Sequence, residues 1–188
     1  MLCPRCGSFK VSETKNLEGI PDVYTYRCID CQDGFDEDNL GNVDELIHLF
    51  SDGACSKNPG PAGAGVLMRY KKYERRISKF LGDATNNIAE LTAILIGLKE
   101  VKSHKRHIPV KVYTDSQYSI GVLSNLTWKP KKNVALINDI KALISTFDKV
   151  TFVKVKGHSD HIENNITDKL AVDAYRTRKN TSIKNCIK

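Results

Sequence analysis

The sequence has no long apolar run. None of its hydrophobic stretches approaches the roughly 20 residues that a membrane-spanning helix needs, and no apolar stretch of signal-peptide length follows Met1. We therefore expect an intracellular, soluble protein, cytoplasmic by default. The sequence leaves the oligomeric state open, with a monomer as the default. Its 188 residues, 40% of them hydrophobic, suit one medium globular domain with a small appendage.

Acidic residues are scarce in most of the chain but not at its start. Residues 1–44 contain four Lys/Arg and nine Asp/Glu, a formal charge of −5, whereas residues 45–188 contain 25 and 13, a charge of +12. Only the second segment has the positive charge that a nucleic-acid-binding surface needs. A basic surface that merely keeps the protein in solution is the alternative.

The sequence has six cysteines, and four of them form two Cys-x-x-Cys pairs. Cys3 and Cys6 make the first pair, and Cys28 and Cys31 make the second. In an intracellular protein this spacing favours one structural Zn²⁺ held by four thiolates; a redox pair or two unrelated pairs are the alternatives. We predict a zinc ribbon over residues 1–36, stabilised largely by its metal because so short a segment cannot build a large core.

An acidic linker, residues 37–44, precedes a regular alternation of strand and helix patterns. We expect strands at 46–51, 65–70, 73–80, 109–114 and 150–155, and helices at 86–102, 116–124, 134–147 and from 162 onward. This order predicts an α/β fold with a mixed five-stranded sheet flanked by helices. We assign residues 45–175 to this domain and residues 176–188 to a basic, frayed C-terminal tail.

Four carboxylates interrupt the apolar pattern of this domain. Asp52 and Asp115 each follow a predicted strand, whereas Glu90 and Asp168 lie in predicted helices. If the two strands are adjacent and parallel, their acids emerge at the same edge of the sheet, where ligand sites gather. A buried carboxylate is costly unless it is paired or holds a metal. Each acid alone could instead be a helix cap or a surface charge.

Oxygen ligands without His or Cys favour Mg²⁺ or Mn²⁺ over zinc. Two such ions about 4 Å apart could activate a water and stabilise the leaving oxygen of a phosphodiester. Four acids in a basic domain therefore indicate a divalent metal site that acts on a polyanion.

The sequence contexts of these acids resemble type 1 ribonuclease H (RNase H). The resemblance covers about residues 45–175 and rests on five segments that follow the family's order: Ser51–Gly65, Thr85–Leu91, Tyr113–Gln117, Val155–Ser159 and Asn164–Ala171. It implies an RNase H-like fold and endonucleolytic hydrolysis of the RNA strand of an RNA–DNA hybrid, leaving 5′-phosphate and 3′-hydroxyl ends.

The resemblance also implies residue roles. It gives Asp52, Glu90, Asp115 and Asp168 as ligands of two Mg²⁺ or Mn²⁺ ions. It gives His158 as a loop histidine that shuttles a proton or helps product release.

Substrate contacts follow from the same resemblance. The candidates for contacts to the ribose 2′-hydroxyl are the amides of Asn58, Asn87 and Gln117, since an amide both donates and accepts hydrogen bonds. The candidates for contacts to DNA phosphates are Thr85, Asn86 and Asn133. For each of these asparagines, and above all for Asn58 before Pro59-Gly60, a turn or helix-capping role is the alternative.

The ribbon does not suit a hybrid-binding module. Phosphate attraction is the main source of non-specific affinity, and four thiolates with one Zn²⁺ would bring the ribbon's formal charge to about −7. We hypothesise that it docks a protein partner or folds back on the basic domain; a stabilising appendage is the alternative.

Two other functions compete with this reading. The first is a related enzyme that acts on DNA, such as an integrase or transposase, and the second is a non-catalytic zinc-ribbon adaptor. The Asn/Gln set with His158 argues against the first. The four acids argue against the second, because a pure binding protein does not need them.

Overall fold

A computed structural model describes residues 46–124, 128–155 and 162–186 in full, and the backbone alone of residues 11–13, 26–28 and 34–35. The chain divides into two compact units, Met1–Asp44 and Glu45–Lys188. The first unit contains a three-stranded antiparallel sheet of order β1-β2-β3, with bounds β1 (Val11–Glu13), β2 (Tyr26–Cys28) and β3 (Gly34–Phe35).

The second unit is built on a six-stranded mixed sheet of order β8-β7-β4-β5-β6-β9. The strands are β4 (Ile47–Cys55), β5 (Gly60–Tyr70), β6 (Tyr73–Ala84), β7 (Val110–Thr114), β8 (Val150–Lys154) and β9 (Thr181–Cys186). The helices are α1 (Asn86–Glu100), the 3-10 turn η2 (Ser103–Lys105), α2 (Gln117–Ser124), α3 (Val134–Ile144) and α4 (Ile162–Thr177). Strands β4, β7 and β8 are parallel, and β4, β5, β6 and β9 are antiparallel to their neighbours in turn.

The predicted α/β order is confirmed, but the prediction of five strands is wrong. Residues 176–188, expected to be a frayed tail, contain the end of α4 and a sixth strand, β9, which pairs antiparallel with β6. Asn180, directly before β9, also contacts β6: its Oδ1 accepts a hydrogen bond from the Phe80 N–H at 2.9 Å. All six residues of β9 are exposed, so the strand has no buried apolar face. The sequence therefore lacks the alternation of apolar and polar residues from which a strand is predicted.

The segment between Asp52 and Gly65 also differs from expectation. The expected strand at 46–51 ended before Asp52, and the next expected strand began only at residue 65. Instead β4 continues to Cys55 and β5 begins at Gly60, so Asp52 lies inside a strand. The turn is limited to residues 56–59 between the two strands, and Gly53, Gly63 and Gly65 lie inside the strands, where helices pack closely against them.

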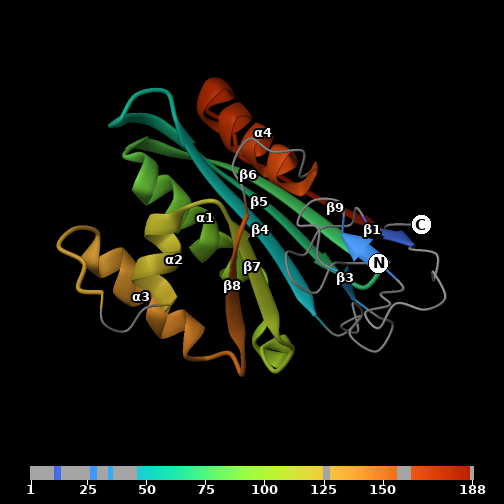
Figure 1. The fold of residues 1–188 in the computed structure, drawn as a ribbon. Coiled ribbons are helices and arrows are strands. Elements are labelled where there is room, and N and C mark those ends of the chain that lie inside the picture. Colours follow the sequence, from blue (N-terminus) through green and yellow to red (C-terminus); the bar gives the residue numbers. More distant parts are fainter. Residues whose placement is uncertain are drawn as a thin grey trace. The chain divides into compact units, whose positions relative to one another are not determined.

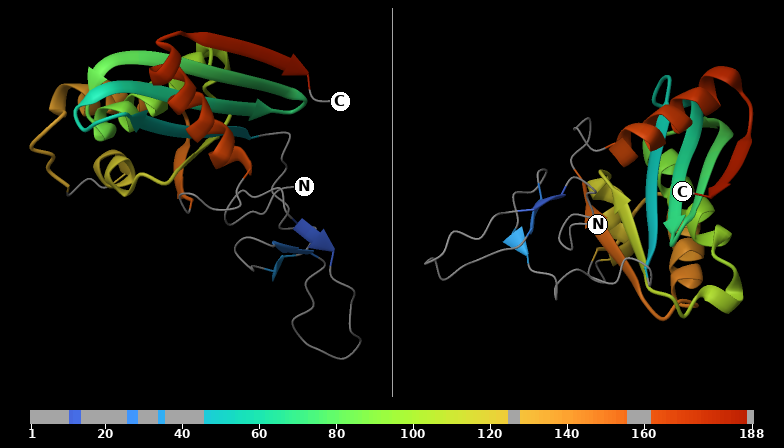
Figure 2. Two further views of the ribbon diagram at one scale, coloured as in Figure 1. Left: turned by 90° about the horizontal axis from the view of Figure 1, so that it is seen from above. Right: turned by 90° about the vertical axis from the view of Figure 1, so that its right-hand side faces the viewer.

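Helices cover both faces of the sheet. Figure 1 shows α4 across one face and α1, α2 and α3 on the other, and Figure 2 shows β9 running beside β6 at the edge. Leu49, Val66 and Ile94 belong to the larger core, between the sheet and α1. On the α4 face, Phe50 stacks on Tyr113 with ring centroids 4.5 Å apart. Among the described helices, none combines the length and apolar character needed to cross a membrane.

Candidate active site

Asp52 and Asp115 come from neighbouring parallel strands. Phe50 of β4 lies opposite Tyr113 of β7. Asp52 lies two residues further along β4, and Asp115 directly follows Thr114, the last residue of β7. Continuation of the same register would place the two acids side by side and on the same face. Asp52 is only 9% exposed.

Two glycines beside Asp52 let two helices approach it. A Cβ on Gly53, the next residue, would lie 2.2 Å from the backbone nitrogen of Glu90 in α1. A Cβ on Gly65, the cross-strand partner of Asp52, would lie 2.0 Å from the carbonyl oxygen of Thr167 in α4. No side chain fits at either position. The helix that carries Glu90 therefore packs from one face, and the helix that carries Asp168 packs from the other.

Hydrogen bonds hold the carboxylate of Glu90. Its Oε1 accepts from Asn86 Nδ2 at 2.8 Å, and the side chain of Ser116 also bonds to it. Ser116 directly follows Asp115 and caps the next helix, since its Oγ accepts from the Ser119 N–H at 3.2 Å. One short segment therefore supplies an acid and a residue that orients a second acid.

The electrostatics show that the acids interact. Burial raises the pKa of Asp52 to about 7, with further increases from the charges of Asp115, Asp168 and Glu90. A hydrogen bond from the Gly53 N–H to Asp52 Oδ1 at 2.8 Å opposes the increase without cancelling it. Burial also raises the pKa of Glu90, and Asp115 adds to that increase, whereas Ser116 and Asn86 oppose it. The cluster therefore lacks compensating positive charge.

This donor set suits a hard divalent cation. Its ligands are carboxylate oxygens, which Mg²⁺ and Mn²⁺ prefer, and a cation would relieve the repulsion that raises the pKa of Asp52. Within the described ranges, no three His, Cys, Asp or Glu side chains already form a group that could hold one ion. The acids form a loose cluster that an ion would draw together.

The predicted substrate residues at the start of α1 form a capping group. Thr85 is the N-cap, and its Oγ1 accepts from the Ile88 N–H at 3.4 Å. Asn58 Oδ1 accepts from the N–H of Asn86, the first residue of α1, at 3.2 Å. Asn87 is exposed beside them. These side chains surround the helix end that presents Glu90.

The other two predicted contacts lie on α2 and α3. Gln117 is exposed at the first position of α2, and its Oε1 accepts from Lys154 Nζ at 3.3 Å. Asn133 precedes α3 in a left-handed conformation with φ 58°, and its Nδ2 donates to Tyr118 OH at 3.4 Å. Gln117 is two residues from Asp115, so it lies near the acids, whereas Asn133 belongs to the α2–α3 layer.

Several predicted residues lie outside the described part of the chain. These are His158 and the cysteines Cys3, Cys6 and Cys31. Cys28 is the last residue of β2, where the backbone alone is described.

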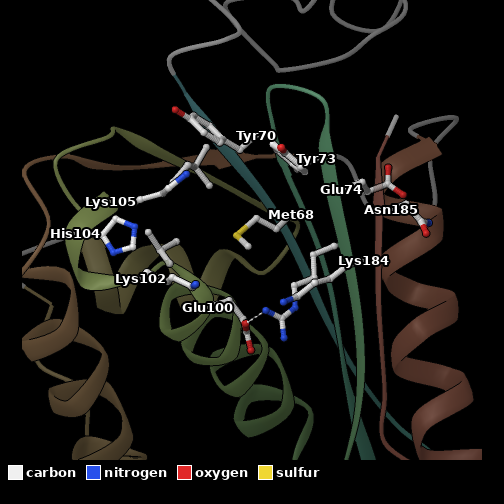
Figure 3. Close-up of a pocket in the computed structure, with 13 residues that line it drawn as sticks. Met68, Tyr70, Tyr73, Glu74, Glu100, Lys102, His104, Lys105, Lys184 and Asn185 are labelled. Carbon is white, nitrogen blue, oxygen red and sulfur yellow. Dashed lines mark ion pairs between the residues drawn. The ribbon is translucent and has the colours of Figure 1, made fainter. Parts of the chain in front are cut away.

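A pocket of about 350 Å³ lies elsewhere, at the opposite end of the strands (Figure 3). Ile47 at the start of β4, Tyr70 at the end of β5 and Lys102 after α1 line it. The acid cluster is at the other end of β4 and at the first turns of α1, so this pocket is not the candidate active site.

Comparison with known proteins agrees with the geometry. A family profile described as RNase H matches residues 44–176. Over 140 residues the chain is 39% identical to a ribonuclease H of Desulforamulus reducens, covering 68% of this chain and 86% of that protein. It is 38% identical over 141 residues to a ribonuclease HI of Neisseria meningitidis, covering 69% and 94%.

The chain belongs to the type 1 ribonuclease H family. The prediction made from five sequence segments is confirmed at this level. The fold is RNase H-like as well: LC11-RNase H1, solved in complex with an RNA/DNA hybrid, matches with a TM-score of 0.60 at 23% identity, covering 70% of this chain and 98% of that one.

The sequence interpretation missed Ser116 as a residue of the ribonuclease H site. Two signals were available: Ser116 directly follows a candidate acid, and the pattern Ser116-x-x-Ser119 at the start of a predicted helix is typical of an N-cap. Its bond to Glu90 depends on how α1 packs against the strand of Asp115, which no local pattern encodes.

Proposed function

We propose that the chain hydrolyses the RNA strand of RNA–DNA hybrids with two divalent ions held by Asp52, Glu90, Asp115 and Asp168. Family membership makes it a ribonuclease H, an enzyme that cleaves RNA in such hybrids, and it implies a divalent metal. The number of ions, the ligand set and the 5′-phosphate and 3′-hydroxyl products are the finer parts of the proposal. The observation that carries it is the buried Asp52, whose pKa is raised to about 7 by burial and by the three other acids.

Bound ions would activate a water and stabilise the leaving oxygen of the phosphodiester. The chain's own residues prepare this site before any ion binds. Gly53 orients the Asp52 carboxylate through its N–H, and Asn86 and Ser116 orient Glu90. Placing the acids on a sheet and two packed helices limits their movement, which is the condition for precise metal sites.

The substrate would lie over the start of α1 and along α2. Asn58, Asn87 and Gln117 are proposed to contact ribose 2′-hydroxyls, and Thr85, Asn86 and Asn133 to contact DNA phosphates. The positions of Asn58, Thr85 and Asn86 at the helix end that presents Glu90 support this. His158 is proposed to shuttle a proton or help product release; its place ten residues before Asp168 supports this role.

The test is a hybrid in which each strand is labelled separately, incubated with Mg²⁺. We expect cleavage of the RNA strand alone; cleavage of DNA would support an integrase-like enzyme, and binding without cleavage a non-catalytic adaptor. Asp115→Asn removes one ligand and one repulsive charge, so it should abolish cleavage and leave the fold intact. Normal cleavage by this variant would refute the ligand assignment.

The first unit is proposed to be a zinc ribbon held by Cys3, Cys6, Cys28 and Cys31. The spacing of the cysteines supports this proposal. We propose that it docks a protein partner, because its negative charge disfavours phosphate contact. Purified protein should contain one zinc per chain, and removal of residues 1–40 should leave hybrid cleavage intact. A large loss of hybrid affinity on removal would contradict this role.

A further inference from the structure

A row of polar side chains crosses the sheet at His48, four residues before Asp52 on β4. Its register runs through every strand in turn: Thr151, Lys111, His48, Arg69, Glu74 and Asn185. The middle of the row contacts the start of α4, because Arg69 donates a hydrogen bond to Glu163 in the first turn of that helix. A charged row under a helix is unusual, since most sheet faces under helices are apolar.

Arg69 connects two buried carboxylates. Its Nε donates to Glu74 Oε2 and its Nη1 to Glu163 Oε1, both at 2.8 Å. The side chains of Glu74 and Glu163 are only 5% and 7% exposed, and that of Arg69 is 17% exposed. Arg76 Nε donates to the second oxygen of Glu74 at 2.7 Å. Two cations therefore face two anions.

The charges around this network favour the ionised pairs. Burial would raise the pKa of Glu74, but its bonds to Arg69 and Arg76 outweigh burial and lower it. His48 lies beside Arg69 across the β4–β5 pairing. Burial, Lys111 and Arg69 lower its pKa to about 4, so it stays neutral and does not compete for the carboxylates.

Glu163 is the point where this network holds α4. The helix begins at Ile162, directly after residues outside the described ranges. Further along, Ser78 Oγ donates to the Leu170 carbonyl at 2.7 Å, and Gly65 lies against Thr167. Asp168 is five residues after Glu163, about 7.5 Å along the axis, so it lies between the Glu163 contact and the Leu170 contact.

We propose that Glu163 is a positioning residue for Asp168. Its ion pair with Arg69 fixes the first turn of α4 on the sheet, and this sets how far Asp168 reaches toward Asp52. The inference rests on the proposed role of Asp168 as a metal ligand. Glu163 itself points to Arg69 and the sheet, so it acts on the site only through the helix.

The test compares Glu163→Gln with a matched control, Glu100→Gln. The control breaks the Arg75–Glu100 ion pair on the α1 side, whose side chains are 25% and 27% exposed. Binding of Mn²⁺ alone is measured by calorimetry, and thermal unfolding is followed in parallel. We expect Glu163→Gln to weaken Mn²⁺ binding by about 10-fold, the lower end for residues that orient ligands, and Glu100→Gln to leave it unchanged.

A second background separates positioning from general damage. In Asp168→Asn, Glu163→Gln should cause no further loss of Mn²⁺ affinity, although it should lower the unfolding temperature as it does in the wild type. An equal loss of affinity in both backgrounds, or none in either, would overturn the proposal for Glu163 alone. If Asp168→Asn by itself leaves Mn²⁺ affinity unchanged, the proposed ligand set fails as well. Should Glu163→Gln not fold, Glu163→Asp, which keeps the charge on a shorter side chain, must show the same dependence on Asp168.

Discussion

Asp52→Asn should make the metal-free protein more stable at pH 8. The pKa of Asp52 is about 7 in the folded domain, against an ordinary 3.8, and each pKa unit corresponds to about 1.4 kcal/mol. The ionised side chain therefore costs the fold up to about 4 kcal/mol. Asparagine cannot ionise, and its Oδ1 can still accept the bond from the Gly53 N–H. Because solvent and side-chain adjustment reduce such penalties, we expect a gain of about 2–4 kcal/mol.

The dependence on pH gives the sign of the effect. An acid with a raised folded pKa destabilises the fold only when it is ionised there. The penalty is thus absent below pH 3.8, develops between about pH 4 and pH 7, and is complete above pH 7. The difference between Asp52→Asn and wild type should therefore grow across this window. Addition of Mg²⁺ should stabilise the wild type and have little effect on the variant.

Urea unfolding in the presence of a chelator measures this difference. Trp128 is the only tryptophan and lies in the second unit, so its fluorescence reports on that unit alone. Asp83→Asn is the matched control, because it removes an exposed acid from β6 and should change stability by no more than about 0.5 kcal/mol. If Asp52→Asn is no more stable than Asp83→Asn at pH 8, the four acids do not repel one another as argued.

Three further predictions concern other parts of the domain. Gly65→Ala would place a Cβ 2.0 Å from the Thr167 carbonyl, so it should displace α4 and lower unfolding stability by about 1–3 kcal/mol; an unchanged urea midpoint would contradict this close contact. Truncation after Lys179 removes the six cross-strand pairs of β9 and should lower the unfolding temperature. An unchanged unfolding temperature would mean that this segment is a frayed tail that does not stabilise the domain. His158→Ala should slow turnover at saturating hybrid without abolishing it; an unchanged rate would remove its proposed role.

The sequence predicted the order of the elements from β4 to α4 because the residues of these elements follow an apolar period. Strand β7 and helix α1 appear close to their expected bounds for this reason. It also singled out Asp115 and Glu90, because they interrupt apolar segments, and in the structure the charges of both act on Asp52. Strand β9 could not be predicted in this way. Its stability comes from backbone pairing with β6 and from the Asn180–Phe80 bond, and backbone pairing leaves no periodic signal in an exposed strand.

The position of Asp52 was mispredicted for a related reason. Glycine and proline usually indicate a turn, and the segment from Gly60 to Gly65 contains both. Here Gly63 and Gly65 are required by the close approach of α4 to the strand, because a Cβ on either would lie within 2.2 Å of a carbonyl oxygen of that helix. The Arg69–Glu163 contact could not be predicted either, because it joins residues 94 positions apart. Neither residue interrupts a sequence pattern in its own segment.

The same packing explains why the acids stay together without a metal. Repulsion between Asp52 and Asp168 acts to push α4 away from the sheet. Three contacts oppose it: Thr167 against Gly65, Ser78 with the Leu170 carbonyl, and Glu163 with Arg69. On the opposite face, Gly53 holds α1 and Glu90 close in the same way. These contacts on both faces thus oppose the repulsion between the acids and keep them together, as the proposed cation site requires.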